Sequence, residues 1–190
     1  MWLNKLKTLF SFALVRAFRF FRKVPYSRNK ELLIVKVDAI GDYILFRNFI
    51  EAIKKSKKYC DHKVTLVGNS LWKDLATQFD KEVVDHFIWI DRHKFGRSFL
   101  YGFKSLWSLS KKDYRVAING AVSREFLLGD LLIGSVFSKE KVRAKSHINP
   151  NLSWLMDQIG GLFYTETVRI PESYNFEFYK NKYYIGQIID

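Results

Sequence analysis

Two aspartates and a glycine lie directly after an apolar run near the start of the chain. The run ELLIVKVD, residues 31–38, is typical of a buried strand, and a helical pattern begins at Asp42. Gly41 supplies a turn where backbone or ligand can approach closely. In the first turn of a helix, unpaired N–H groups and the helix dipole favour an ionised carboxylate, which can accept a proton from a bound hydroxyl. Asp42 is therefore a candidate general base, and a role as a helix cap stays equally open.

Lys36 and Asp38 add two opposite charges at the end of the same predicted strand. Lys36 alternates with Ile34 in a strand that we expect to be buried on both faces, so its side chain either points into a ligand crevice or extends to the sheet edge. Asp38 either orients Lys36, binds a ligand hydroxyl or only forms the turn. Both residues are candidates for substrate binding.

Ser123 and Arg124 follow a later predicted strand, near the start of a helix. A cation at that position opposes the helix dipole, typically by about 0.3–1 kcal/mol, without an obvious local gain. Such exceptions are enriched at functional sites, so both residues are candidates for substrate contacts. The alternative is an exposed arginine paired with Glu125 or Asp130.

Other common sites are disfavoured by residue type. A dinucleotide fingerprint needs three glycines, whereas VKVDAIGD offers one glycine and two carboxylates that repel phosphate, and no P-loop GK[ST] occurs. The single cysteine excludes an internal disulfide and a cysteine-based metal cluster. The four histidines show no ligand spacing, so we expect no metal site.

These candidate residues depend on an alternation of strand and helix patterns. Strands are predicted at residues 31–38, 63–68, 86–91, 114–119 and 141–145, and helices at 42–55, 70–79, 98–109, 125–136 and 152–160, with Ser70 as an N-cap. Such alternation indicates right-handed βαβ units and a Rossmann-like parallel sheet with helices on both faces. Ligands of open parallel sheets bind beyond the carboxyl ends of the strands, where DAIGD would lie.

Residues 1–30 form a separate basic segment that we predict to be an amphipathic helix and linker. They contain eight Lys or Arg and no Asp or Glu, and their longest uncharged run is shorter than the ~20 residues needed to span a bilayer. One helical face would carry Trp2, Leu3, Leu6, Leu9, Phe10, Ala13, Ala17, Phe20, Phe21 and Val24. An apolar face opposite a basic face is typical of a helix lying on an anionic membrane. Packing of this helix on the domain is the alternative.

The length and the charge distribution limit the number of domains and the kinds of binding partner that the protein can have. The 190 residues, 48% hydrophobic, suffice for one well-packed domain with an appended segment. Residues 1–30 supply +8 of the net charge of +13, which leaves a mildly basic remainder. This uneven distribution favours a localised contact with an anionic surface over binding of nucleic acid.

The run LLIVKVDAIGDYILFRNFIEAIKKS, followed by KVTLVG and VVDHFIWID, resembles the start of family 9 glycosyltransferases, the group of lipopolysaccharide heptosyltransferases. In that family a strand leads into a basic residue, an acidic or small residue and then Gly-Asp. Lys36, Asp38, Gly41 and Asp42 match this pattern. YRVAINGAVSREFLLGDLLIGSVF is similar, more loosely, to a later strand and helix of the family, and the similarity covers roughly residues 31–160.

The resemblance implies one half of a GT-B enzyme, which has two Rossmann-like domains. The first domain binds the saccharide acceptor and the second a nucleotide sugar such as ADP-heptose. Asp42 would then deprotonate the acceptor hydroxyl for inverting transfer, with neither a cofactor nor an essential metal. We expect residues 31–165 to be the acceptor-side domain and residues 166–190 a tail or interrupted linker toward an absent donor-binding domain.

The sequence therefore predicts a glycosyltransferase-like protein of lipopolysaccharide or other cell-envelope glycan synthesis, incomplete in itself. Its partners would be a glycolipid or oligosaccharide acceptor, a nucleotide-sugar donor and, through residues 1–30, an anionic membrane, with no nucleic acid. We expect a cytoplasmic location, peripheral on the inner face of the bacterial inner membrane. The alternative function is a non-catalytic, membrane-anchored binding module with the same fold.

Overall fold

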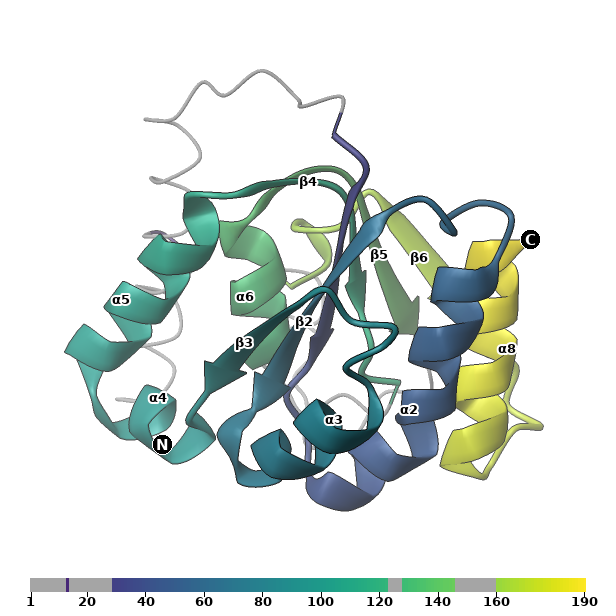
Figure 1. Ribbon diagram of the computed structural model, residues 1–190, viewed down its shortest axis with the longest axis horizontal. Coiled ribbons are helices and arrows are strands. Elements are labelled where there is room, and N and C mark those ends of the chain that lie inside the picture. The colour runs from purple at the N-terminus through teal and green to yellow at the C-terminus, as the bar shows by residue number, and fades with distance from the viewer. Residues whose placement is uncertain (1–12, 14–28, 123–127, 146–159) are drawn as a thin grey trace.

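In the part of the chain that the structure describes, six strands pair in a single sheet, with helices between them (Figure 1). The computed structural model describes residue 13 and residues 29–122, 128–145 and 160–190. The elements in chain order are β1 (Glu31–Lys36), α2 (Ile40–Lys55), β2 (Lys63–Asn69), the short 3₁₀ helix η1 (Ser70–Trp72), α3 (Lys73–Phe79), β3 (His86–Ile90), α4 (Arg92–Arg97), α5 (Phe99–Ser110), β4 (Asp113–Asn119), α6 (Leu128–Ser135), β5 (Phe137–Lys145), β6 (Glu166–Arg169) and α8 (Glu177–Ile189).

The strand order is β3-β2-β1-β4-β5-β6, and every pairing is parallel. This confirms the predicted α/β fold, and the order is that of doubly wound sheets. The chain winds outward from β1 in one direction and then resumes at β4 on its other side, where Leu32 pairs with Val64 and with Val116. A crevice beyond the carboxyl ends of β1 and β4 is therefore the expected ligand site of this topology.

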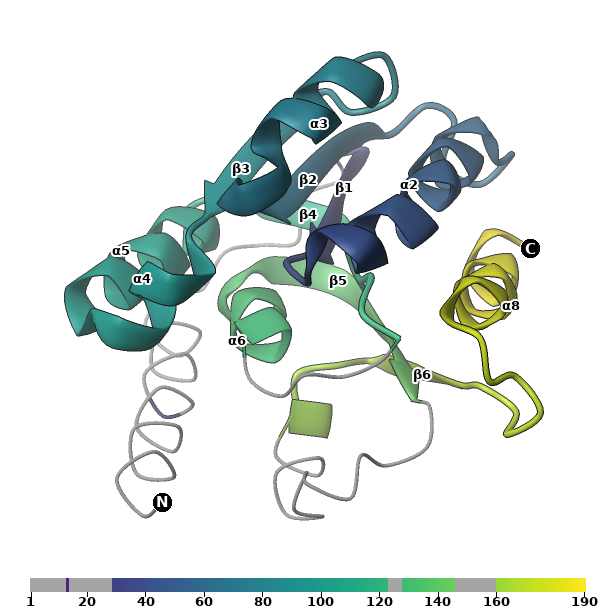
Figure 2. The same cartoon turned by 90° about the horizontal axis from the view of Figure 1, so that it is seen from below.

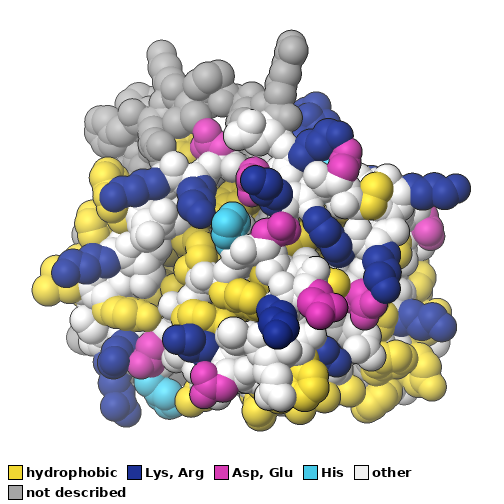
Figure 3. Space-filling model, viewed as in Figure 1, with side chains coloured by type: hydrophobic (Ala, Val, Ile, Leu, Met, Phe, Trp, Pro, Cys, Tyr) yellow, Lys and Arg dark blue, Asp and Glu magenta, His cyan; other side chains and the backbone are white. Residues whose placement is uncertain are grey.

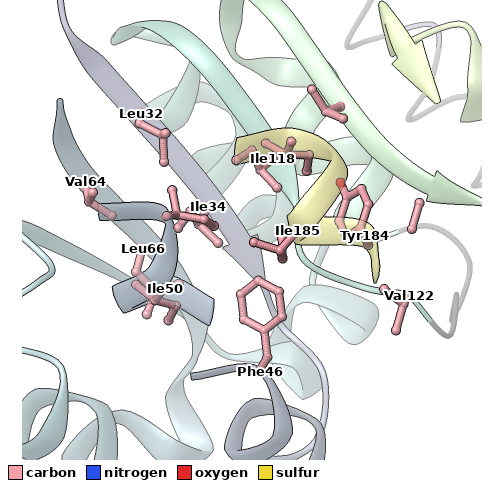
Figure 4. Packing of buried hydrophobic residues seen from close by; sticks show 14 of the residues in the cluster. Leu32, Ile34, Phe46, Ile50, Val64, Leu66, Ile118, Val122, Tyr184 and Ile185 are labelled. Carbon is pink, nitrogen blue, oxygen red and sulfur yellow. The ribbon is translucent and has the colours of Figure 1, made fainter. Parts of the chain in front are cut away.

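Helices cover both faces of the sheet, as the view from its lower edge shows (Figure 2). On β1, Leu32 and Ile34 belong to a core shared with α2 and α8 (Figure 4), while Leu33 and Val35 belong to a second core shared with α5 and α6. All four side chains are completely buried. A strand covered on both faces needs apolar side chains at successive positions, which explains the continuous run LLIV.

Residues 166–190 differ from their predicted role as a tail or linker. β6 extends the sheet beside β5, and α8 packs on α2, where the rings of Phe49 and Phe178 lie 5.3 Å apart. The core-facing side chains of this segment are Val168, Ile170, Tyr184, Ile185 and Ile188. The predicted boundary at residue 165 is therefore wrong, because the segment buries apolar surface in the same core as β1.

Several helix boundaries also differ from the predictions. Asn69 rather than Ser70 caps the helical segment after β2, since its side chain accepts a hydrogen bond from the backbone N–H of Leu71. Ser98 caps α5 through the N–H of Tyr101. The predicted helix at residues 1–30 and most of that at 152–160 lie outside the described residues. Within the described ranges, no helix is long and apolar enough to cross a membrane.

Candidate functional site

The turn between β1 and α2 presents Asp42 at the carboxyl edge of the sheet. Ala39 is the N-cap of α2 in extended conformation, and Asp42 lies in the first helical turn, as predicted. Its side chain is half-buried, and no donor in the described part of the chain is hydrogen bonded to it. The interpretation of Asp42 as a helix cap is therefore wrong, because Ala39 holds that position. The carboxylate has the helix dipole behind it and open acceptor capacity.

Lys36 is completely buried just below this turn. Its Nζ lies 2.9 Å from an Asp38 carboxylate oxygen and 3.8 Å from Glu177, and it donates to the carbonyl oxygen of Gly120 at 3.1 Å. The Nζ also lies 5.1 Å from the ring centre of Phe46. Lys36 therefore does not extend to the sheet edge. Since an unpaired buried ammonium costs several kcal/mol, these partners are what allow it there.

The backbone of Asp38 is fixed from the end of β2. Its carbonyl oxygen accepts hydrogen bonds from Asn69 Nδ2 at 3.3 Å and from Trp72 Nε1 at 3.1 Å. The Trp72 ring stacks on Tyr43 of α2 at 4.2 Å with an interplanar angle of 7°. Two sets of contacts thus fix the turn that carries Asp42. Lys36 pairs with the Asp38 carboxylate, and Asn69 and Trp72 donate hydrogen bonds to the Asp38 carbonyl oxygen.

Tyr43 connects this cluster to a second ion pair. Its hydroxyl donates to the Asp80 carboxylate, which also lies 2.9 Å from Arg47 Nη2. Burial, and then the hydrogen bond to Asp80, raise the pKa of Tyr43 well above its ordinary value. Tyr43 therefore stays a protonated donor, and the start of α2 is fixed to the end of α3.

Gly41 is exposed, and a Cβ added there would meet nothing within 4 Å. Its backbone is not in the left-handed region. Neither packing nor conformation requires glycine at this position, so the turn explanation for Gly41 is not supported. Approach of a ligand beside Asp42 stays a prediction.

On the opposite face of the sheet, a buried polar cluster lies at the ends of β4 and β5. Asn119 Nδ2 donates to the Tyr164 hydroxyl at 2.7 Å, which donates to Asp130 at 2.5 Å. The Arg143 guanidinium lies 5.4 Å from the centre of the Tyr164 ring. Asn119 Oδ1 also accepts from the N–H of Ala121 at 3.1 Å, which fixes the backbone as it leaves β4.

Ser123 and Arg124 themselves lie outside the described residues. The segment that leads to them starts at Gly120, whose carbonyl contacts Lys36. The ends of β1 and β4 are thus brought together, while the contacts of the two predicted binding residues stay predictions. In the described ranges, no group of three or more His, Cys, Asp or Glu side chains is arranged to hold a metal ion.

Sequence reasoning missed Glu177, Asn69 and Gly120. Asn69 could have been found, because a polar residue directly after the buried run KVTLVG would lie at the carboxyl edge. Gly120 follows the next central strand in the same way. Glu177 carries no such signal, since its place depends on α8 packing beside α2.

Two solved structures of E. coli heptosyltransferase WaaC resemble this chain. The structure with ADP matches with a TM-score of 0.55 and 16% sequence identity, over 83% of this chain and 46% of that chain. The structure with ADP-2-deoxy-2-fluoro heptose matches with a TM-score of 0.60 and 14% identity, over 83% of this chain and 47% of that chain. No protein-family model and no curated protein matches the sequence.

At these identities the likeness concerns the fold, and this chain spans slightly less than half the length of each structure. The matching part includes a six-stranded parallel sheet with helices on both faces. The chain therefore has a Rossmann-like fold that matches one half of a GT-B structure.

Proposed function

We propose that this chain is the acceptor-side half of an inverting glycosyltransferase of lipopolysaccharide or other cell-envelope glycan synthesis. It would act with a nucleotide-sugar donor carrying a heptose-like sugar. The observation that carries the proposal is the placement of Asp42. A half-buried carboxylate without a hydrogen-bond donor among the described residues lies at the switch point of the sheet, on a turn fixed by Lys36, Asn69 and Trp72.

In the proposed reaction, Asp42 accepts the proton of an acceptor hydroxyl. The hydroxyl oxygen forms a bond to the anomeric carbon of the donor sugar, and the bond between that carbon and the diphosphate oxygen breaks, with the electron pair leaving on the nucleotide diphosphate. Asp42 lies in the first turn of α2, where the helix dipole favours negative charge. General base catalysis of this type typically contributes about 10²–10⁴-fold to the rate.

The Lys36–Asp38 pair has a supporting role in this proposal. Because Lys36 is completely buried, it acts through the position of Asp38 rather than by direct contact with a ligand from solvent. The Asp38 carboxylate is partly exposed, at 14%, and is the member of the pair that could accept a hydrogen bond from an acceptor hydroxyl. Ser123 and Arg124 are proposed as further acceptor contacts.

The donor half of the site would come from a further domain, in the same polypeptide or in a partner chain. The WaaC structures contain ADP or an ADP-sugar analogue, and about half of each lies outside the match. This supports a nucleotide-sugar donor here. Residues 1–30 are proposed to attach the protein to the cytoplasmic face of the inner membrane.

The test is transfer of labelled heptose from ADP-heptose to core oligosaccharide, with protein isolated from its own cells so that the donor-binding half is retained. Asp42→Asn should lower the rate by about 10²-fold or more. The matched control is Asp74→Asn, since Asp74 is an exposed carboxylate in the first turn of α3. Equal rates for Asp42→Asn and the unaltered protein would refute the base assignment.

Binding of the oligosaccharide to the purified chain should be measured in parallel by calorimetry. Saccharide binding without any transfer, even from the cell-isolated protein, would favour the binding module. Absence of both would remove the proposed function.

A further inference from the structure

Charged side chains of both signs lie next to one another on the molecular surface (Figure 3). The charged Lys36 and the polar Asn181 differ from these, because both side chains are completely buried. Asn181 belongs to α8, and neither atom of its amide has a hydrogen-bond partner in the part of the chain that the structure describes. A buried amide without hydrogen bonds is costly, so it indicates that another molecule completes its surroundings.

Helix periodicity places Asn181 beside the Lys36 ammonium. Glu177, Asn181 and Ile185 follow one another at intervals of four residues and therefore share one face of α8. At one end of this row, a Glu177 carboxylate oxygen lies 3.8 Å from Lys36 Nζ. At the other end, Ile185 points toward Phe46 in the same core (Figure 4), and the Phe46 ring centre lies 5.1 Å from Lys36 Nζ. Asn181 lies between these two contacts.

The Lys36 ammonium has hydrogen-bonding capacity in the direction of Glu177. An ammonium group carries three donors. Among the described residues, two of them have acceptors, which are the Asp38 carboxylate at 2.9 Å and the Gly120 carbonyl oxygen at 3.1 Å. The separation of 3.8 Å from Glu177 is too long for a direct hydrogen bond, whereas a water molecule about 2.8 Å from each atom can bridge it.

We propose that Lys36, Glu177 and Asn181 together bind an internal water molecule. The water accepts a hydrogen bond from the Lys36 ammonium and donates one to the Glu177 carboxylate, and its third hydrogen bond is to the Asn181 amide. Three hydrogen bonds are the usual number for a buried water. The carboxylates of Asp38 and Glu177 repel an anion at this position and Lys36 repels a cation. Water is neutral and can both donate and accept, so it fits this mixture of groups.

The water connects α8 with the turn that carries Asp42. Lys36 pairs with Asp38 in that turn, while Glu177 and Asn181 belong to the first two turns of α8. The position of α8 is thereby linked to the candidate site through polar groups as well as through the apolar core. The inference does not rest on the proposed sugar transfer, because structure and stability are measured without donor or acceptor.

A high-resolution crystal structure of the full chain tests the assignment directly. A solvent peak is expected within about 3.2 Å of both Lys36 Nζ and one atom of the Asn181 amide. The same peak should be lost in crystals of Asn181→Leu. Direct bonding of the Asn181 amide to another protein group, or a map without such a peak in the unaltered protein, would overturn the proposal.

Urea unfolding of Asn181→Leu gives a second test in which the two explanations predict opposite signs. If the amide binds the water, its loss leaves buried groups of Lys36 and Glu177 less well hydrogen bonded, and the unfolding equilibrium constant should rise at least about fivefold. Leucine is the better helix former, so helix propensity cannot cause such a loss. If the amide has no partner at all, its removal should stabilise the protein, and the proposal fails.

Gln187→Leu is the matched control, because Gln187 is an exposed amide on the same helix. Its unfolding equilibrium constant should stay close to that of the unaltered protein. If Asn181→Leu does not fold, the solvent peak in the unaltered protein still decides the assignment.

Discussion

At the scale of single residues, the feature that governs the candidate site is a buried positive charge. Lys36 contacts Asp38, Gly120 and Glu177, which belong to three separate parts of the chain. Its ammonium therefore joins the turn after β1, the end of β4 and the start of α8. This arrangement stabilises the fold only while the carboxylates of Asp38 and Glu177 stay in contact with the Lys36 ammonium, because the charged groups are largely removed from water.

Replacement of Lys36 by methionine should destabilise the fold by about 3–5 kcal/mol, since it removes the cation that lies 2.9 Å from the Asp38 carboxylate in a partly buried site. Urea unfolding measures the change in the free energy of unfolding. Lys55→Met provides the comparison, because Lys55 pairs with Glu51 on the exposed surface, where such ion pairs contribute little to stability. Equal losses for the two variants would contradict the role assigned to Lys36.

At the scale of elements, close packing between β2 and η1 holds the turn that carries Asp42. Trp72 lies over Gly68 and contacts Trp89 edge to face, with ring centres 5.6 Å apart. From that position its indole N–H reaches the carbonyl of Asp38. A small residue in β2 is therefore a condition for the geometry of the neighbouring β1–α2 turn.

Gly68→Ala should destabilise the protein by about 1–3 kcal/mol, the usual cost of overpacking. The added Cβ would lie 2.4 Å from a ring atom of Trp72 and 2.7 Å from one of Trp89. Gly41→Ala is the control, because its Cβ meets nothing and alanine is favoured over glycine in a helix by about 1 kcal/mol. Thermal unfolding should show a lower Tm for Gly68→Ala only, and a normal Tm for that variant would exclude the packing argument.

At the scale of the whole molecule, several tyrosines are buried in the two cores. Burial raises the pKa of Tyr59 and of Tyr114 to about 12 each, with nearby carboxylates adding to the effect. Burial also raises the pKa of Tyr184. These phenols stay neutral in the folded protein at a pH where the same groups ionise in the unfolded chain.

The free energy of unfolding should therefore fall as the pH rises above about 10, the ordinary pKa of tyrosine. Below that pH both states hold the phenolic protons, so these groups cause no change. Between pH 10 and 12 each such tyrosine can contribute a loss of up to about 1.4 kcal/mol per pH unit. Urea unfolding from pH 9 to 11 tests this, and Tyr59→Phe should show a shallower decline than the unaltered protein.

The sequence predicted the parallel sheet and the placement of Asp42 because both depend on local patterns. The run LLIV has no polar face, and DAIGD follows it directly, so the strand, the turn and the first helical turn could be read in order. The role of α8 could not be read in this way. Glu177 and the buried Tyr184 reach the core only because α8 lies beside α2, and no local signal encodes that distant packing.

The complete burial of Lys36 also could not be predicted from the local sequence. An alternating pattern shows which face of a strand a residue occupies, but the partners that make burial of an ammonium acceptable come from Gly120 and Glu177, far along the chain. The same limit applies to Gly41. The glycine has no packing or backbone reason in the described structure, and approach of a ligand beside it stays a prediction.

The strand order also affects how the chain is made. β1 can pair with β2 soon after both leave the ribosome, but its other edge has to wait for β4, since Leu32 pairs with Val116. Until then the apolar run LLIV of β1 is open to pairing with other nascent chains, and such distant parallel pairings form slowly. The centre of the sheet, rather than its rim, is therefore the part of this protein most exposed to misassembly during synthesis.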